Sequence, residues 1–321
     1  MAVKLICASH SPLMEFASPQ EKRQEQAVRD AFDTLAAEVK AYDPTLIITF
    51  GPDHFNGFFY DLMPSFCVGI RATAAGDWDY GKDNNHINVP EDTAIDLVRR
   101  VLDEGVDVAY SYRMQADHGV TQPLHFLCGG HLDRYPTIPI FINGAAAPMP
   151  TTKRTVALGR AVGQFIKSLN LENERVLILG TGGLSHDPPT PQMGSVPPEV
   201  EEFLIAGRNP TTEARNNRQS KIITVGQKLA AGDKSVAVPL NPAWDRALLE
   251  IFAKADFASI EAMTEAAIRV EGGRGGQEVR SWMAAFAALH EMGEYDMTTH
   301  CYEDISEWIA GFGIVSAELK G

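Results

Sequence analysis

Short apolar runs, each followed by a polar turn, are the feature of this sequence that most constrains its fold. The runs occupy residues 3–9, 45–50, 106–112, 137–142 and 175–180, and amphipathic helical spacing lies between them, over 91–104 and roughly 152–169. Strands that are apolar throughout are buried on both faces, as happens when helices cover both sides of a parallel sheet. We therefore predict an α/β fold with a mainly parallel central sheet flanked by helices.

Two further signals refine this organisation. Ser18 and Glu21 form a capping-box pattern around Pro19 and predict the start of a first helix, which the Asp-Pro pair at 43–44 ends. From about residue 198 the pattern becomes mostly helical, with helices predicted over 244–255, 259–270 and 277–292. Because the chain has no fixed-period repeat and no low-complexity tract, we predict a single domain, residues 1–321, with a helical C-terminal portion.

Composition excludes several classes of protein. The chain has 42 acidic and 28 basic side chains, a formal net charge of −14, which argues against binding to nucleic acid. The four cysteines are far apart and form no C-x-x-C motif, so neither a disulfide framework nor a zinc-thiolate site is indicated. No apolar run is long enough to span a bilayer, and the first residues resemble a strand rather than a signal peptide. We expect a cytoplasmic protein.

Histidines stand at or just after the ends of predicted strands. They are His10 in "ASHSP", His54 in "GPDHFNG", His118 in "ADHGVTQP" and His186 in "GLSHDPP". In open α/β sheets, ligands bind at the carboxyl ends of the strands. A single histidine of this kind is more often a loop residue with a local hydrogen bond, whereas four together favour a site. Their spacing alone does not establish that they converge.

Several charged residues allow two interpretations. Asp53 and Asp117 each precede a histidine, and an Asx-turn or a helix cap explains them at least as well as a catalytic dyad. Glu278 falls in the first turn of a predicted helix, where the helix dipole favours a carboxylate whatever its function. Three arginines could bind an anionic substrate or could be solvated surface charges: Arg113, Arg134 and Arg274.

Familiar catalytic motifs are missing from the sequence. The stretch "GTGGLS" fails both the G-x-G-x-x-G and the P-loop patterns, and neither a G-x-S-x-G elbow nor an H-E-x-x-H helix occurs. The residues by themselves therefore favour an α/β enzyme with a histidine-rich site, in which histidine and carboxylate could hold a metal. They do not specify a reaction.

A wider set of motifs resembles one enzyme family. The segments are "SHSP", "PDHFNGFFYDLMPSFCVG", "YRMQADHGVTQPL", "PIFING", "GTGGLSHDPP", "PLNPAWDRALL", "SWMAAFAAL" and "EWIAGFG". Together they resemble the class III extradiol ring-cleavage dioxygenases, from the first strand to the last segment. Residues 195–235 match least.

The resemblance implies a non-haem Fe(II) bound by His10, His54 and Glu278, with Glu271 as the nearest rival carboxylate. It implies that His118 and His186 are the acid–base residues. The implied reaction is extradiol cleavage, by O2, of a catechol with a substituent at position 3. The implied substrates are 2,3-dihydroxyphenylpropionate and 2,3-dihydroxycinnamate, in the catabolism of aromatic compounds.

Two alternatives stay open beside the dioxygenase. The same histidine and carboxylate cluster could serve a zinc-dependent hydrolase, or the chain could be a non-catalytic interaction protein of the same fold. Such an interaction protein would be expected to lose some of the five site residues, and this chain keeps all of them. We expect a catecholic substrate and O2 as partners, no nucleic acid, no membrane, and a homo-oligomeric state.

Overall fold

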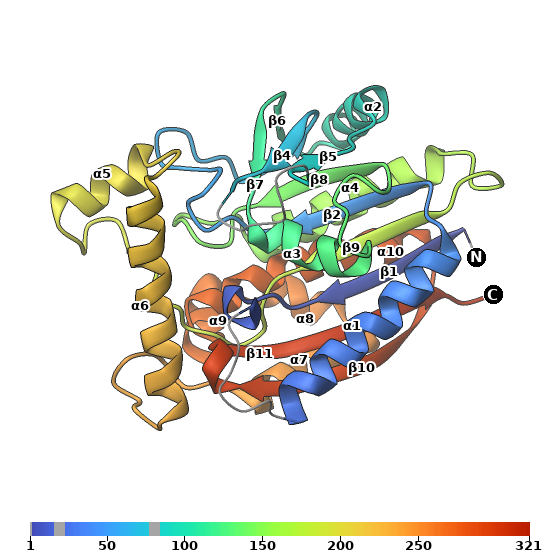
Figure 1. The fold of residues 1–321 in the computed structure, drawn as a ribbon. Coiled ribbons are helices and arrows are strands. Elements are labelled where there is room, and N and C mark those ends of the chain that lie inside the picture. Colours follow the sequence, from blue (N-terminus) through green and yellow to red (C-terminus); the bar gives the residue numbers. More distant parts are fainter. Residues whose placement is uncertain (1, 16–22, 77–83) are drawn as a thin grey trace.

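The structure is a computed structural model that describes residues 2–15, 23–76 and 84–321. Its centre is an eight-stranded sheet in the order β10-β11-β1-β9-β2-β8-β3-β6, and a three-stranded sheet in the order β5-β4-β7 lies beside it (Figure 1). The strands are β1 (Val3–Ala8), β2 (Leu46–Gly51), β3 (Phe66–Gly69), β4 (Ala72–Ala74), β5 (His86–Ile87), β6 (Ala109–Ser111), β7 (Met114–Ala116), β8 (Thr137–Ile142), β9 (Val176–Thr181), β10 (Tyr295–Ile305) and β11 (Ala310–Leu319).

Four inner strands, β1, β9, β2 and β8, run parallel, which confirms the predicted mainly parallel sheet. All residues of β2, β8 and β9 are buried, because helices cover both faces of the sheet. The antiparallel pairings lie to either side, where β11 joins β1 and β3 joins β8.

Helices cover both faces of the sheet and fill most of the chain after residue 198, as predicted. The α-helices are α1 (Arg23–Tyr42), α2 (Glu91–Asp103), α3 (His118–Leu127), α4 (Thr152–Ser168), α5 (Pro198–Ala206), α6 (Thr212–Ala230), α7 (Pro242–Ala253), α8 (Phe257–Ala262), α9 (Glu265–Gly272) and α10 (Arg280–Met292). Short 3-10 turns are η1 (Pro12–Glu15), η2 (Gly275–Val279) and η3 (Ser306–Trp308).

The two faces carry separate apolar cores. One core joins the sheet to α1 and α3, and the other joins it to α2, α4, α7 and α10. Helix α10 packs closely on α4, since a Cβ added at Gly159 would lie 2.3 Å from the carbonyl oxygen of Ala284. The start of α10, just after Glu278, lies close to β9, since a Cβ added at Gly180 would lie 3.3 Å from the carbonyl oxygen of Ser281.

Several boundaries differ from the predictions. The strand predicted over 106–112 is reduced to β6, and the helix predicted over 259–270 is divided where Thr264 caps α9. The helix predicted from residue 277 begins as the 3-10 turn η2. The C-terminal hairpin of β10 and β11 was not anticipated. The predicted capping box at residues 18–21 lies outside the described residues.

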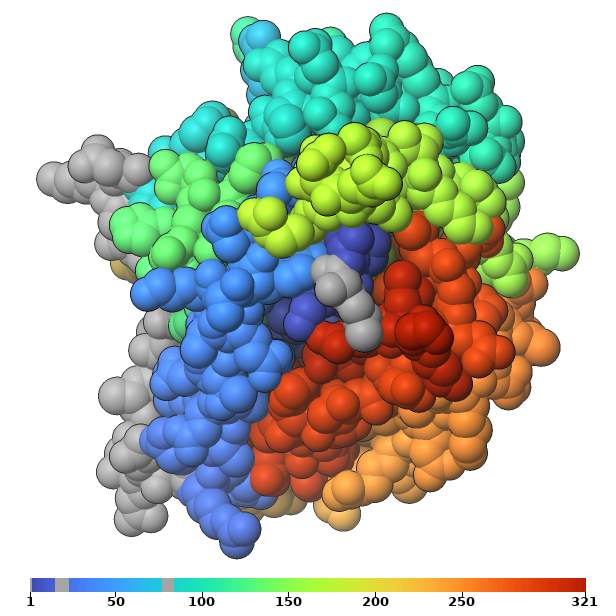
Figure 2. All heavy atoms as spheres, turned by 90° about the vertical axis from the view of Figure 1, so that its right-hand side faces the viewer, coloured from blue at the N-terminus to red at the C-terminus, as the bar shows by residue number. Residues whose placement is uncertain are grey.

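The edge of the molecule near both termini shows how the first strand is enclosed. In Figure 2, β1 (dark blue) lies between α1 (blue) and the C-terminal segment (red). Its sheet partners are β9 on one side and β11 on the other. None of the described helices is long and apolar enough to cross a membrane.

Candidate metal centre and active site

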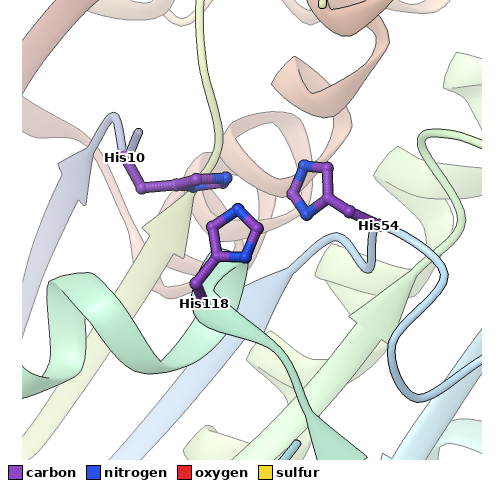
Figure 3. Close-up of side chains that lie close together, drawn as sticks. All are labelled: His10, His54 and His118. Atoms are coloured by element: carbon purple, nitrogen blue, oxygen red, sulfur yellow. The ribbon is translucent and has the colours of Figure 1, made fainter. Parts of the chain in front are cut away.

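The predicted site residues meet at the carboxyl ends of the parallel strands. His10 follows β1, His54 follows β2 and His186 follows β9, while His118 begins α3. Figure 3 shows His10, His54 and His118 turned toward one another, and their ligand nitrogens lie within 4.8 Å of each other. Segments distant in sequence are thus brought together at one edge of the sheet, as the strand-end rule predicts.

The carboxylate of Glu278 lies among three of these imidazoles. Its Oε1 is 2.9 Å from Nε2 of His54 and 3.0 Å from Nε2 of His186, and its Oε2 is 3.5 Å from Nε2 of His10. The backbone N–H of Gly183 donates to Oε2 as well, at 3.1 Å. Glu278 is 2% exposed, so these contacts form away from bulk water.

Asp117 orients His54 from the opposite side of the ring. Its Oδ2 accepts from both Nδ1 and the backbone N–H of His54, at 2.7 Å each, which leaves Nε2 of His54 facing Glu278. Its Oδ1 accepts from the N–H of Gly119 and caps α3, as one of the two interpretations of this residue predicted. The contact with His54 was missed, and no signal in the sequence links residues 63 positions apart.

His118 lies in a helix rather than in the predicted loop. It is the first residue of α3, a helix that contains Pro123. A proline has no N–H, so it cannot bond to the carbonyl four residues earlier, which belongs to Gly119. The hydroxyl of Thr181 donates to that carbonyl instead, and this bond ties α3 to the last residue of β9. The Gly and Pro residues of this segment suggested a loop, but the carbonyl of Gly119 is satisfied by Thr181 in place of the missing helical hydrogen bond.

The ring of His186 is held between backbone segments. Its Nδ1 donates to the carbonyl of Leu184 at 3.0 Å, because a carbonyl can only accept. A Cβ added at Gly275 would lie 2.1 Å from Nε2 of His186, and one at Gly183 would lie 2.5 Å from Nδ1. Glycine is therefore required at both positions for the ring to fit.

A buried aspartate supports the same loop. Asp245 accepts from the backbone N–H and the hydroxyl of Ser185, at 2.7 Å each, and from the hydroxyl of Tyr302 at 2.8 Å. Burial raises the pKa of Asp245, although these hydrogen bonds act in the opposite direction. The C-terminal hairpin thereby contributes to the position of His186.

Burial and charge act differently on each group of the cluster. Burial lowers the pKa of His10 to about 3, although Glu278 opposes the shift, so its imidazole is neutral. Burial would also lower the pKa values of His54 and His186, but the nearby carboxylates outweigh it and raise both. Burial would raise the pKa of Glu278, yet His186 and His54 hold it well below its ordinary value.

This donor set fits a divalent metal ion. Adjacent ligands at about 2.1 Å from one ion are about 3 Å apart, close to the separations between Glu278 and the Nε2 atoms of His54 and His10. The buried Nδ1 of His10 has no hydrogen-bond partner among the described residues. His54 has the carboxylate partner that metal-bound histidines usually have. A bound metal would replace the imidazole protons.

The remaining candidates are placed elsewhere, with one exception. Glu271 is exposed and accepts from Asn241 at 3.0 Å, outside the cluster. Arg113 and Arg134 are exposed. Arg274, by contrast, lines an open pocket together with His54 and Glu278.

Comparison with known proteins identifies the family. A family model described as "Catalytic LigB subunit of aromatic ring-opening dioxygenase" matches residues 4–313 of the chain. The chain belongs to this family. This dioxygenase is therefore an enzyme that opens aromatic rings, and the assignment favours neither a hydrolase nor a non-catalytic interaction protein. The family and the buried histidine cluster together indicate a metal site.

Curated relatives cover the whole dioxygenase chain. A Photorhabdus laumondii protein named 2,3-dihydroxyphenylpropionate/2,3-dihydroxicinnamic acid 1,2-dioxygenase is 60% identical over 99% of this chain and 98% of its own. Two proteins with the same name are 45% identical (Rhodococcus rhodochrous, 100% of this chain and 99% of its own) and 46% identical (Azotobacter vinelandii, 100% of both).

The contact between Asp117 and His54 leads to a first prediction. Asp117→Asn should weaken metal binding about 10- to 100-fold, because a neutral amide oxygen is a weaker acceptor for the Nδ1–H of His54 than a carboxylate. Titration of the protein with Fe(II) in the absence of O2 measures this. Asp256→Asn is the control, since Asp256 also caps a helix, α8, and among the described residues its side chain hydrogen-bonds only to Ser259. Equal metal affinity in Asp117→Asn and the unaltered protein would exclude the supporting role.

Proposed function

We propose that the chain binds Fe(II) through His10, His54 and Glu278 and catalyses extradiol cleavage of 2,3-dihydroxyphenylpropionate, and of 2,3-dihydroxycinnamate, by O2. His118 and His186 carry protons in this reaction. The observation that carries the proposal is the buried carboxylate of Glu278 in contact with imidazoles at the strand ends of a ring-opening dioxygenase. The substrates are taken from the names of the full-length relatives.

The donor types favour iron. Two imidazoles and one carboxylate, with further positions left open, are the ligand set of non-haem Fe(II) oxygenases. An ion held by His10, His54 and Glu278 would supply binding positions for a catecholate and for O2 and would couple the two electronically. Both oxygen atoms enter the product, a 2-hydroxy-6-oxo-dienedioate, so the reaction needs no external reductant.

The protein's own groups then move the protons. In the structure both ring nitrogens of His186 face acceptors, the carbonyl of Leu184 and the carboxylate of Glu278. If Glu278 binds a metal instead, a neutral His186 that keeps its proton on Nδ1 would present the lone pair of Nε2 toward the cluster. That tautomer suits a base that accepts a proton from the catechol hydroxyl. His118, whose ring stacks on His54 at a centroid distance of 4.5 Å, is then the group that returns a proton later in the reaction.

A second ligand set has one specific observation in its favour. His10, His54 and His118 form a three-imidazole cluster, and three histidines are the ligand set of many zinc enzymes. If this set binds the metal, His118→Ala will lose it and Glu278→Ala will retain it. The proposed set requires the opposite result.

An assay for O2-dependent turnover tests the proposed reaction. With Fe(II), ascorbate and 2,3-dihydroxyphenylpropionate in air, we expect a yellow ring-opened product that contains two atoms of ¹⁸O from labelled O2. Without O2 the substrate should bind but not react, and oxidation of the iron by peroxide should inactivate the enzyme. Turnover without O2, or full activity with zinc in place of iron, would disprove ring cleavage.

A further inference from the structure

A pocket beside the cluster contains one arginine. The pocket is open to solvent, and its lining includes His54 and Glu278 of the cluster. Its other walls include Ala145, Pro188 and Arg274. A group bound at the cluster can therefore extend a substituent past apolar atoms toward a guanidinium.

The guanidinium of Arg274 has one edge occupied and one edge available. Its Nε and Nη2 donate to the two oxygens of Asp187, at 2.6 and 3.1 Å, so this carboxylate takes the side-on edge. The end-on edge consists of Nη1 and the second proton of Nη2. Among the described residues, only a long contact of 3.4 Å from Nη1 to the carbonyl of Thr190 involves it. A second carboxylate could bind there with two hydrogen bonds.

Asp187 also fixes the arginine in place. It accepts from the backbone N–H of Arg274 at 3.1 Å and from that of Val238 at 3.0 Å, in addition to the side-chain bonds. The side chain of Arg274 is 28% exposed, so it reaches the pocket without being fully solvated. An arginine held in this way loses little side-chain entropy when a ligand binds.

We propose that Arg274 is a specificity-determining residue that binds the carboxylate of an acidic substituent on the catechol ring. The inference rests on the proposed function for the ring itself. An anionic substituent needs a local donor here, because the chain carries a net charge of −14 and the buried carboxylates of Glu278 and Asp117 would repel it. Apolar substituents of the same length cannot hydrogen-bond to the end-on edge of the guanidinium and therefore gain no binding affinity from it.

Two substrates of matched length separate this role from a structural one. Steady-state kinetics of Arg274→Gln should show kcat/KM for 2,3-dihydroxyphenylpropionate lowered about 10- to 100-fold, mostly through KM. The loss for 3-propylcatechol, which has a methyl group in place of the carboxylate, should be at least ten times smaller. Arg274→Lys should recover part of the lost activity, since a lysine supplies the positive charge but not the two parallel N–H donors of a guanidinium.

Arg175→Gln is the matched control. Arg175 also pairs with an aspartate and with backbone carbonyls, but it lies at the opposite end of β9. Both substrates should react with this variant as with the unaltered enzyme. Equal losses on both substrates in Arg274→Gln would mean that the residue only supports the loop of His186, and unchanged kinetics would assign the carboxylate to another group. Either result overturns the proposal.

A binding measurement tests the role of Arg274 independently of ring cleavage. Calorimetry with 3-phenylpropionate, which lacks both hydroxyls and cannot be cleaved, reports on the carboxylate contact without iron or O2. We expect affinity to fall about 10-fold or more in Arg274→Gln. If the unaltered protein cleaves neither catechol, the proposed function fails, and this measurement still decides the role of Arg274. Equal affinity in both proteins would refute it.

Discussion

Glu278→Ala should remove bound iron and reduce ring cleavage by about 10³-fold or more, since the metal supplies several kcal/mol of stabilisation to such reactions. The carboxylate contacts His54 and His186 directly and approaches His10, so its removal takes away the only carboxylate of the proposed ligand set. Iron content by elemental analysis and turnover of 2,3-dihydroxyphenylpropionate measure the two effects.

Controls are needed because this variant also removes the carboxylate that faces the buried Nε2 atoms of His54 and His186. Breaking a buried ion pair typically costs about 3–5 kcal/mol, so circular dichroism must show that the protein is folded. Glu278→Gln, which keeps the size of the side chain, should lose iron with a smaller effect on stability. Glu271→Ala removes the exposed rival carboxylate and should retain both iron and activity. Normal iron content in Glu278→Ala would exclude it as a ligand.

His186→Ala and His118→Ala should each retain iron and lower kcat by about 10²- to 10⁴-fold, the usual contribution of a general acid or base. Loss of the base should slow formation of the bound catecholate, which absorbance under anaerobic conditions detects. Loss of the acid should leave that step intact and let an oxygenated intermediate decay without product. We expect the first behaviour in His186→Ala and the second in His118→Ala.

A histidine remote from the cluster provides the control for these two variants. His300 lies on β10 and bonds to the hydroxyl of Ser316, so His300→Ala should behave like the unaltered enzyme. Loss of iron in His186→Ala or His118→Ala would make that histidine a ligand. Normal turnover would return it to the role of an ordinary polar residue.

The secondary structure could be predicted for segments whose apolar pattern directly reflects how deeply they are buried. The runs at 45–50, 137–142 and 175–180 are apolar throughout, and all became strands covered on both faces. Strand β10 was not recognised, because most of its residues are exposed or only partly buried and its sequence is largely polar. Helix α3 was missed because Pro123 usually breaks a helix, and only a hydroxyl distant in sequence compensates for its missing bond.

The site could be predicted in part for the same reason. The local sequence pattern alone places four histidines at or just after strand ends, and this indicates that they lie at a common edge of the sheet. The position of Glu278 followed only from the family resemblance, since its partners lie 92 and 224 residues away. The contact of Asp117 with His54, and that of Asp187 with Arg274, depend on tertiary packing that no local pattern records.

The position of β1 has a consequence for the order in which the protein can assemble during synthesis. This strand is made before the other strands of its sheet, yet Val3 pairs with Val176 and Lys4 pairs with Glu318. Contacts between residues so far apart in sequence form late, because a long loop must close before they contribute. The strand that precedes His10 therefore completes its pairing only after β9 and β11 have been made. A chain truncated before β11 would leave the edge of β1 exposed to aggregation and its metal ligand unplaced.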